Sequence, residues 1–317
     1  MKRFTIQFAV VTAALIVGAC NPAATPTQVP TATAVPIATP TEGPTATPAP
    51  TPVAVVPPGE LNIAGRLLIC IDIPYPPQAF FDDQGNPTGA DPDLGAEIAR
   101  RLGLQVEVIN SVFDTIIAAV NAGKCDIIIS AQNITEERTA QVDMIPYFKA
   151  GQSFVVLKGN PEAIQAELDF CGKKVAMETG TTQVDYIEGT GDHAASGGLK
   201  KKCTDAGKTA PEAVQFQKDS DALLALQAKQ VAAYFADSPV AGYYTVQQPE
   251  AFELAPIPPL DPIIEGISVP KTKTGLLNAV KTALLSMMDD GAYLEILKKY
   301  GLEAGAIEAS AVVVNQP

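Results

Sequence analysis

Short apolar runs alternate along the chain with apolar residues at helical spacing. This alternation predicts short buried strands separated by helices. Apolar runs such as the one that opens the predicted strand Leu67–Ile73 are typical of strands buried in a parallel sheet. Leu94, Ile98 and Leu102 recur at helical spacing before Gly103, which predicts an amphipathic helix that ends at the glycine. The resulting order is strand, helix, strand, helix, strand, over residues 67–73, 91–102, 106–109, 113–121 and 126–129. This order predicts a parallel sheet with right-handed crossovers.

The same alternation starts again after residue 148. Further strands are expected at 154–157, 173–177 and 231–235, with helices opening at 180 and spanning 220–230. Asp237 follows the last of these strands, directly before Ser238-Pro239, which suit the first turn of a helix. Residues 274–300 predict two helices broken at Asp290-Gly291 that cover the first sheet. We therefore expect two α/β lobes with a cleft between them. The predicted bounds are 60–149 and 265–308 for lobe 1, 150–264 for lobe 2, and 309–317 for a short tail.

The segment Gly123–Arg138 joins a predicted strand to a predicted helix and carries candidate binding groups. Small polar residues at 130–133 follow the strand, and Thr135 is placed to cap a helix whose first turn holds two glutamates and Arg138. Helical side chains lean toward the helix N-terminus, so the Arg138 guanidinium reaches the crevice at the carboxyl end of the strand. A guanidinium beside free backbone N–H groups suits a carboxylate ligand. A solvated arginine paired with a neighbouring glutamate is the alternative.

The N-terminal residues have the pattern of a targeting segment. Lys2 and Arg3 precede an apolar stretch at 8–17, and Val17-Gly18-Ala19-Cys20 resembles the lipobox of bacterial lipoproteins. That resemblance implies a signal peptide over 1–20 and a lipid on Cys20; an ordinary secretory signal is the alternative. Residues 21–59 contain eleven of the 27 prolines, and their Pro/Thr-rich composition cannot form a packed core. They are expected to form a disordered tether.

Charge and apolar content argue against two classes of function. The chain of 317 residues has 22 basic and 35 acidic residues, which disfavours nucleic-acid binding. No apolar run reaches the eighteen or so residues that a membrane-spanning helix needs. The length is sufficient for one large or two medium domains with their own cores.

The cysteines are compatible with disulfides in an exported protein. Cys171 and Cys203 are the preferred pair, whereas Cys70 and Cys125 lie on two predicted strands and either pair or stay reduced. Zinc is disfavoured because no C-x-x-C spacing occurs and His193 is the single histidine. His193 falls in a glycine-rich polar loop and is expected to be solvated rather than catalytic. No metal or other cofactor is expected.

Seven short motifs, taken in order, resemble the family 3 extracellular solute-binding proteins, the amino-acid receptors of bacterial ABC importers. Together they run across residues 61–303. The motifs are Asp72-x-x-Tyr75-Pro-Pro, Gly89-Ala-Asp-x-Asp-Leu94, Gly123-Lys-Cys-Asp-Ile127, Ile134-Thr-Glu-Glu-Arg138, Gly180-Thr-Thr-Gln183, Phe235-Ala-Asp-Ser-Pro239, and Asp290-Gly-Ala-Tyr293 with Lys299-Tyr-Gly301. The resemblance implies a type II periplasmic-binding-protein-like fold that closes around one free amino acid.

By this resemblance, the two charges of the amino acid meet opposite charges in the cleft. Arg138 would hold the α-carboxylate with help from the backbone near Asn133, Thr181 and Thr182 would add donors, and Asp237 would take the α-ammonium. Ligand contacts drawn from both lobes would favour closure. The implied ligand-binding set is Asp72, Tyr75, Gln78, Phe113, Ser130, Asn133, Arg138, Glu178, Thr181, Thr182 and Asp237.

The remaining positions are expected to surround the ligand side chain. Gln78 stands where the family usually has Phe, which removes an aromatic wall and leaves Asp72, Glu178 and Gln78 around that side chain. Two acidic groups and an amide favour a polar or basic amino acid such as arginine, lysine, ornithine or glutamine. Core packing is the alternative for Tyr75 and Phe113, and a surface charge is the alternative for Glu178.

The expected function is that of a lipid-anchored receptor on the extracellular or periplasmic side, monomeric, which serves an ABC importer and has no catalytic residue. An exported enzyme on the same fold, such as a dehydratase or a lytic enzyme, is the alternative, since fold does not fix function. It would need a general acid, for which Glu178 is the candidate. A sensory module is a third possibility, but it would require a membrane span and a signalling domain that the sequence lacks.

Overall fold

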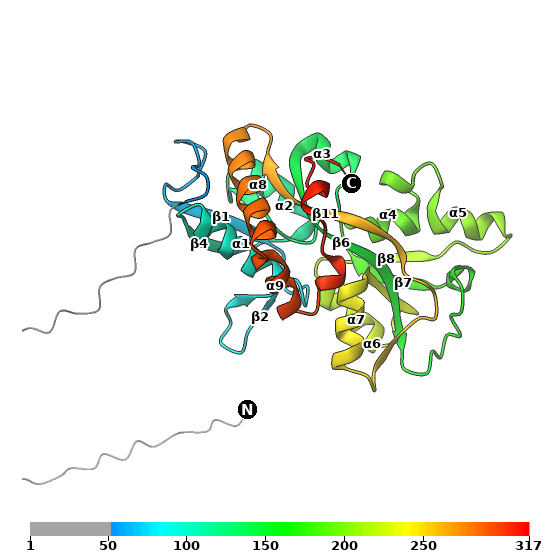
Figure 1. Cartoon of the computed structure of the whole chain (residues 1–317). Coiled ribbons are helices and arrows are strands. Elements are labelled where there is room, and N and C mark those ends of the chain that lie inside the picture. The colour runs from blue at the N-terminus through cyan, green and yellow to red at the C-terminus, as the bar shows by residue number, and fades with distance from the viewer. Residues whose placement is uncertain (1–51, 317) are drawn as a thin grey trace, which may run out of the picture. The chain divides into compact units, whose positions relative to one another are not determined.

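One mixed sheet of nine strands forms the centre of the described chain (Figure 1). The computed structural model describes residues 52–316, apart from the side chain of Asp261. The predicted signal peptide, Cys20 and residues 21–51 of the predicted tether lie outside the described residues. The strands are β1 (Arg66–Ile71), β2 (Phe80–Phe81), β3 (Pro87–Thr88), β4 (Gln105–Asn110), β5 (Ile127–Ile128), β6 (Val142–Leu157), β7 (Lys174–Glu178), β8 (Glu212–Phe216), β9 (Ala233–Asp237), β10 (Phe252–Leu254) and β11 (Leu260–Pro270). The α-helices are α1 (Ala90–Arg101), α2 (Ile116–Asn121), α3 (Glu136–Gln141), α4 (Thr182–Glu188), α5 (Gly198–Asp205), α6 (Asp219–Gln227), α7 (Ser238–Gln247), α8 (Thr274–Asp289) and α9 (Ala292–Lys299). Short 3₁₀ turns are η1 (Phe113–Thr115), η2 (Glu167–Phe170), η3 (Gly191–His193), η4 (Glu303–Gly305) and η5 (Ala309–Ala311).

Two parallel groups of strands lie toward the two ends of this sheet. Eight of its strands follow the order β4-β1-β5-β11-β6-β9-β7-β8, and the ninth, β10, pairs with β6 off this path. β1 pairs in parallel with β4 and β5, and β7 pairs in parallel with β8 and β9. The parallel pairing expected from the β-α-β pattern is thus confirmed, and the fold is periplasmic-binding-protein-like. The carboxyl ends of each parallel group are the places where such sheets bind ligands.

Two long antiparallel strands, β6 and β11, connect these groups (Figure 1). The sequence predicts a strand only at 154–157, because Pro146 interrupts the apolar pattern. In the structure one strand, β6, continues through it. Pro146 pairs with Gly266 at a register shift in the β6–β11 ladder. Proline cannot donate to a ladder, and irregular pairing of this kind is where sheets accept it.

The buried apolar side chains form separate clusters on the two sides of these long strands. One cluster joins β1 and α1 to α8 and α9, as Ile69, Leu94, Leu284 and Leu297 illustrate. Another lies among β6, β7, β9 and α4 and includes Phe154 stacked on Phe235. The C-terminal helices therefore return to the first strand group, as the sequence predicts (Figure 1). The lobe bounds stay predictions.

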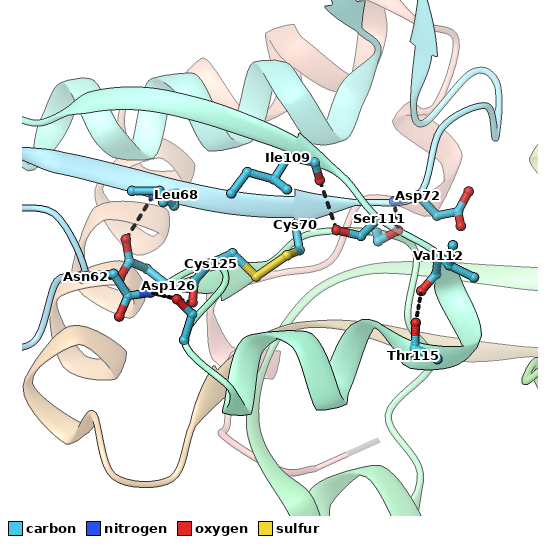
Figure 2. The surroundings of a disulfide bond; sticks show 12 residues. Asn62, Leu68, Cys70, Asp72, Ile109, Ser111, Val112, Thr115, Cys125 and Asp126 are labelled. Carbon is cyan, nitrogen blue, oxygen red and sulfur yellow. Dashed lines mark hydrogen bonds between the residues drawn. A yellow bond between two sulfur atoms is a disulfide. The ribbon is translucent and has the colours of Figure 1, made fainter.

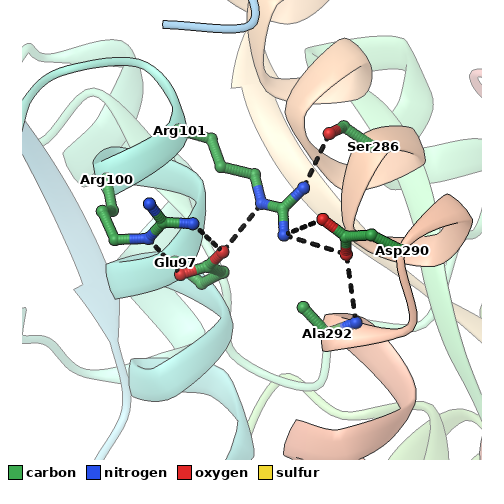
Figure 3. Close-up of polar contacts among 6 residues, drawn as sticks. All are labelled: Glu97, Arg100, Arg101, Ser286, Asp290 and Ala292. Carbon is green, nitrogen blue, oxygen red and sulfur yellow. Dashed lines mark hydrogen bonds and ion pairs between the residues drawn. The ribbon is translucent and has the colours of Figure 1, made fainter. Parts of the chain in front are cut away.

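Arg101 fastens this return by linking α1 to α8. Its guanidinium donates to Glu97 on its own helix, and to Ser286 Oγ at 2.6 Å and Asp290 Oδ1 at 3.0 Å across the interface (Figure 3). The Arg101 side chain is only 6% exposed. Because a buried charge costs free energy unless it is paired, this network specifies how the two helices pack.

The start of the described chain also packs on the first strand group. The Val53 amide donates to the Arg101 carbonyl at 2.9 Å, and Ala54 and Val56 contact the first cluster. The Glu60 carboxylate accepts the amides of Gly275 and Leu276 at the first turn of α8. The described residues of the predicted tether, 52–59, therefore contact the folded body.

Both cysteine pairs are disulfide-bonded in the structure. The predicted Cys171–Cys203 bond is confirmed, and Cys70 and Cys125, for which the sequence left two possibilities, also pair. Cys70 lies on β1, and Cys125 immediately precedes the buried Asp126 and β5. The bond therefore crosses between neighbouring strands (Figure 2). Figure 2 also shows Asp72 at the carboxyl end of β1.

Three further observations concern membrane spans, metals and His193. Within residues 52–316 no helix combines the length and apolar character needed to cross a bilayer. The same residues hold no group of three or more His, Cys, Asp or Glu side chains arranged for a metal ion. His193 is half-buried and packs edge-on against the Tyr186 ring, with the ring centroids 5.2 Å apart.

Candidate functional site

A small cavity lies where segments from both strand groups meet. Ten of the eleven binding residues predicted from the sequence line it, and Gln78 does not. Ala131 and Gln183 line it as well, although the sequence did not single them out for binding. The lining residues are Asp72, Tyr75, Phe113, Ser130, Ala131, Asn133, Arg138, Glu178, Thr181, Thr182, Gln183 and Asp237.

Arg138 is a buried cation at one side of the cavity. The Thr135 hydroxyl accepts the Arg138 backbone N–H at 3.2 Å, so the predicted helix cap is confirmed. The guanidinium donates to the carbonyls of Asn133 and Gly180 at 2.9 and 3.0 Å and lies over the Phe113 ring. No carboxylate among the described residues lies within 4.0 Å of it, so the alternative of a solvated arginine paired with glutamate is wrong. Burial lowers the pKa of Arg138. Its unused N–H groups can hold an anion.

Asp237 is a buried carboxylate from the other strand group. It is the last residue of β9 and precedes α7, as its position before Ser-Pro predicts. It accepts hydrogen bonds from the Tyr75 hydroxyl at 2.7 Å and from the Gln183 amide at 2.9 Å. Burial raises its pKa to about 6, while these two bonds and the charge of Arg138 oppose the rise. The group is therefore mainly ionised at neutral pH and can hold a cation.

Tyr75 and Phe113 both border the cavity, which argues against the alternative that they only pack in an apolar core. The Tyr75 hydroxyl joins Asp237 across the cleft, and burial raises its pKa well above the usual value, so it stays a donor. Phe113 faces the guanidinium of Arg138, with 5.3 Å between the guanidinium carbon and the ring centroid. Neither side chain is purely part of an apolar core.

The Thr182 hydroxyl is fixed between two amides. Its Oγ1 accepts from Asn133 and from Gln152, both at 2.7 Å. These two bonds leave the Thr182 hydroxyl proton free to donate into the cavity. The Thr181 hydroxyl instead donates to the carbonyl of Glu178 at 2.7 Å. Thr181 borders the cavity, but its hydroxyl proton is already used within its own turn.

Asp72 also lines the cavity and is already paired. Its backbone N–H donates to the Ser130 hydroxyl at 2.9 Å, and its carboxylate accepts the Phe113 amide at 2.7 Å. The second carboxylate oxygen accepts the Lys218 ammonium at 2.8 Å. Burial raises the pKa of Asp72, and the Lys218 bond opposes that rise.

Sequence reasoning missed Lys218. It directly precedes α6 and lies just beyond β8, at the carboxyl end of a parallel strand. The sequence analysis did not assign β8, so nothing placed Lys218 at a strand end. One signal could have revealed Lys218. It lies two residues after a short strand of alternating apolar residues and just before Asp219-Ser220, which suit the start of a helix.

Glu178 is buried, so the alternative that it is a surface charge is wrong. It is the last residue of β7 and is 5% exposed. Its Oε1 has no hydrogen-bond partner among the described residues. Burial raises its pKa to about 10, and the neighbouring charges of Asp72 and Asp219 add to the rise. Glu178 is therefore protonated at neutral pH.

The expectation that Gln78 surrounds the ligand side chain is wrong. Its side chain turns away from the cavity, and its amide donates to the Glu265 carboxylate at 2.6 Å. Tyr147 also donates to Glu265, at 3.3 Å, and to Asp91 at 2.8 Å. Glu265 lies on β11, a strand that the sequence did not reveal, so its attraction for Gln78 could not be foreseen. Burial raises the pKa of both carboxyls, that of Asp91 to about 7.

The cavity thus presents a cation and an anion on different elements, with hydroxyl and amide groups between them. A buried Arg138 without a carboxylate partner needs an anion, and Asp237 needs a cation. A zwitterion meets both needs. Among the described residues that line the cavity there is neither a Cys nor a His.

Comparison with known proteins agrees with this geometry. The family model for bacterial extracellular solute-binding proteins, family 3, matches residues 67–303. A probable histidine-binding protein of Campylobacter jejuni is 30% identical over 234 residues, which cover 72% of this chain and 82% of that protein. The structure of an ancestral arginine-binding protein bound to glutamine is 34% identical with a TM-score of 0.66, and covers 75% of this chain and 98% of its own. The ancestral arginine-binding protein bound to arginine is 35% identical with a TM-score of 0.65, and covers 74% of this chain and 98% of its own. Since the family match extends over most of the chain, this chain belongs to the family 3 bacterial extracellular solute-binding proteins.

Proposed function

We propose that this protein captures one free amino acid with a polar or basic side chain and delivers it to an ABC importer. The observation that carries the proposal is the pair of buried, opposite charges of Arg138 and Asp237 in one cavity. Arg138 takes the α-carboxylate with its unused N–H groups, and the Thr182 hydroxyl adds a donor. Asp237 takes the α-ammonium. The relatives named as histidine- and arginine-binding proteins support an amino-acid ligand.

Binding is proposed to close two lobes about β6 and β11. The proposed ligand contacts come from both strand groups, Arg138 from the first and Asp237 from the second. A ligand that bridges two parts binds the closed form better than the open form and so shifts the population toward closure. The two long strands are the chain connections across which such a movement would bend.

The proposed location is the outer face of a cell membrane. Family members are extracellular by the description of the family, and the lipobox-like Val17-Gly18-Ala19-Cys20 supports a lipid on Cys20. The Pro/Thr-rich residues 21–51 would then connect the lipid to the folded body. We propose that it acts as a monomer and meets the permease subunits of its importer in the closed form.

An exported enzyme on this fold is the second candidate, and Glu178 is the observation that favours it. A buried carboxyl that stays protonated at neutral pH has the property of a general acid. We propose that it instead binds ligand, because Arg138 and Asp237 in the same cavity match the two charges of a zwitterion. Recovery of the amino acid unchanged after prolonged incubation with the protein supports a receptor, whereas a new product supports the enzyme.

The proposal is tested by a thermal-shift screen against the common L-amino acids, ornithine and citrulline. A ligand at a hundred times its dissociation constant stabilises the native state by about 2.7 kcal/mol, which the assay resolves. We expect stabilisation by one or a few polar or basic amino acids. Isothermal titration should then give one site per chain. Absence of stabilisation across the panel would refute the proposed function.

A further inference from the structure

We infer that Lys218 is a specificity-determining residue. Because of Lys218, the protein selects an amino acid with an uncharged, hydrogen-bonding side chain over one with a cationic side chain. The ammonium group of Lys218 holds the Asp72 carboxylate that a cationic ligand would otherwise use. The inference rests on the proposed function and narrows its ligand class.

Lys218 belongs to the second strand group, and its side chain reaches acceptors in the first. Its ammonium donates to the Asp72 carboxylate at 2.8 Å and to the carbonyls of Ile73 and Ser111, both at 3.3 Å. These three acceptors satisfy all three of its N–H groups. Asp72 is 3% exposed at its side chain, against 26% for Lys218. Water therefore reaches the pair only from the Lys218 side, and the pairing leaves little of the Asp72 negative charge for a ligand in the cavity.

The charges in and beside the cavity then balance, and no carboxylate is left for a cationic ligand side chain. An amino-acid zwitterion pairs its carboxylate with Arg138 and its ammonium with Asp237. Lys218 pairs with Asp72, and the Glu178 carboxyl is protonated because it is buried beside Asp72. A cationic side chain would find no unpaired carboxylate and would lie close to the ammonium of Lys218. It would have to displace Lys218 from all three of its acceptors.

Two residues that line the cavity each have a buried polar atom that still needs a partner. Glu178 Oε1 and Asn133 Oδ1 have no hydrogen-bond partner among the described residues, although their residues are 5% and 3% exposed. Asn133 Oδ1 can only accept a hydrogen bond, whereas a protonated Glu178 both donates and accepts. A carboxamide or ureido group supplies a donor and an acceptor together. Glutamine and citrulline are therefore the probes that fit this chemistry.

The test is the ratio of dissociation constants for neutral and cationic ligands, measured by isothermal titration at pH 7.5. Glutamine and citrulline are compared with lysine and ornithine for the full protein and for K218M, D72N/K218M and K158M. Lys158 is an exposed lysine that pairs with Glu253 on the surface, so K158M removes the same charge far from the cavity chemistry. Circular dichroism and melting temperature establish that each variant is folded.

We expect the unaltered protein to bind the neutral pair at least tenfold more tightly than the cationic pair. K218M leaves the Asp72 carboxylate unpaired, so this ratio should move by at least tenfold, about 1.4 kcal/mol, toward the cationic ligands. D72N/K218M removes both charges and should return the ratio toward that of the unaltered protein. K158M should leave it unchanged.

Two results would overturn the inference while leaving the proposed function intact. One is tighter binding of lysine or ornithine by the unaltered protein, which would mean that the ligand displaces Lys218. The other is a ratio in folded K218M within twofold of that in the unaltered protein. Failure of every variant to bind any amino acid refutes the proposed function and this inference with it.

Discussion

Replacing Asp237 by asparagine should raise the stability of the ligand-free protein and lower its affinity for the ligand. The substitution keeps the shape of the side chain and removes its charge. Asp237 is 3% exposed and accepts from Tyr75 and Gln183. An asparagine at this position retains one acceptor oxygen, and the Tyr75 hydroxyl can rotate to accept from its amide. The main change is therefore the loss of a buried carboxylate.

The expected gain in stability follows from the pKa of this carboxyl. Burial raises it from 3.8 to about 6 in the folded, ligand-free protein. The folded state therefore binds more protons than the unfolded state between these two values, so the free energy of unfolding falls as the pH rises through that window. A shift of about two pKa units corresponds to a cost of about 3 kcal/mol at pH 7. The variant D237N escapes this cost, and without ligand it should be more stable by up to that amount.

The expected loss of affinity has the opposite sign. Hydrogen bonds to charged groups contribute about 1.5–3 kcal/mol each, and leaving a buried charge without its partner costs about 3–5 kcal/mol. The α-ammonium of the ligand loses such a partner in D237N. We expect the dissociation constant to rise at least a hundredfold, which corresponds to about 2.7 kcal/mol.

Urea unfolding without ligand and isothermal titration with the best ligand of the screen measure the two effects. D205N is the matched control, because Asp205 is an exposed partner of Lys201 on α5 and such surface pairs contribute little. Unchanged affinity in D237N would disprove the assignment of the α-ammonium to Asp237. A less stable D237N at pH 7 would refute the argument from the buried charge.

Three further predictions concern the carboxylate site, the pH and a disulfide. R138K should weaken binding at least tenfold, because a single ammonium cannot replace the guanidinium that spans two carbonyls and an anion, and unchanged affinity by titration would contradict that role. Affinity should fall up to tenfold per pH unit as the pH drops from 6 to 4, because Asp237 becomes protonated in the free protein. Titrations of the unaltered protein at pH 7 and 5 test this prediction, and equal affinities would contradict it. C171S/C203S should lower the free energy of unfolding by roughly 2–4 kcal/mol, because the bond closes a loop with a sequence separation of 32. Urea unfolding measures that loss, and identical midpoints would show that the bond does not constrain the unfolded chain.

The elements that could be predicted from the sequence are those whose residues are neighbours along the chain. The apolar run before residue 72 became β1, and the helical spacing up to Leu102 became α1. Thr135 caps the helix that carries Arg138, and Asp237 ends a strand directly before Ser-Pro. These features follow from side-chain periodicity and local backbone hydrogen bonding, which a sequence displays directly.

Which distant polar groups meet depends instead on how the chain folds. Lys218 pairs with Asp72 over a separation of 146 residues, and Gln78 meets Glu265 over 187. The strand β6 continues through Pro146 because its partner β11 shifts register there. Such contacts depend on how the strands are ordered across the sheet, whereas sequence periodicity reports only which face of an element is apolar. A buried polar group takes whichever partner the packing brings to it, because leaving it unpaired costs more free energy than any local preference contributes.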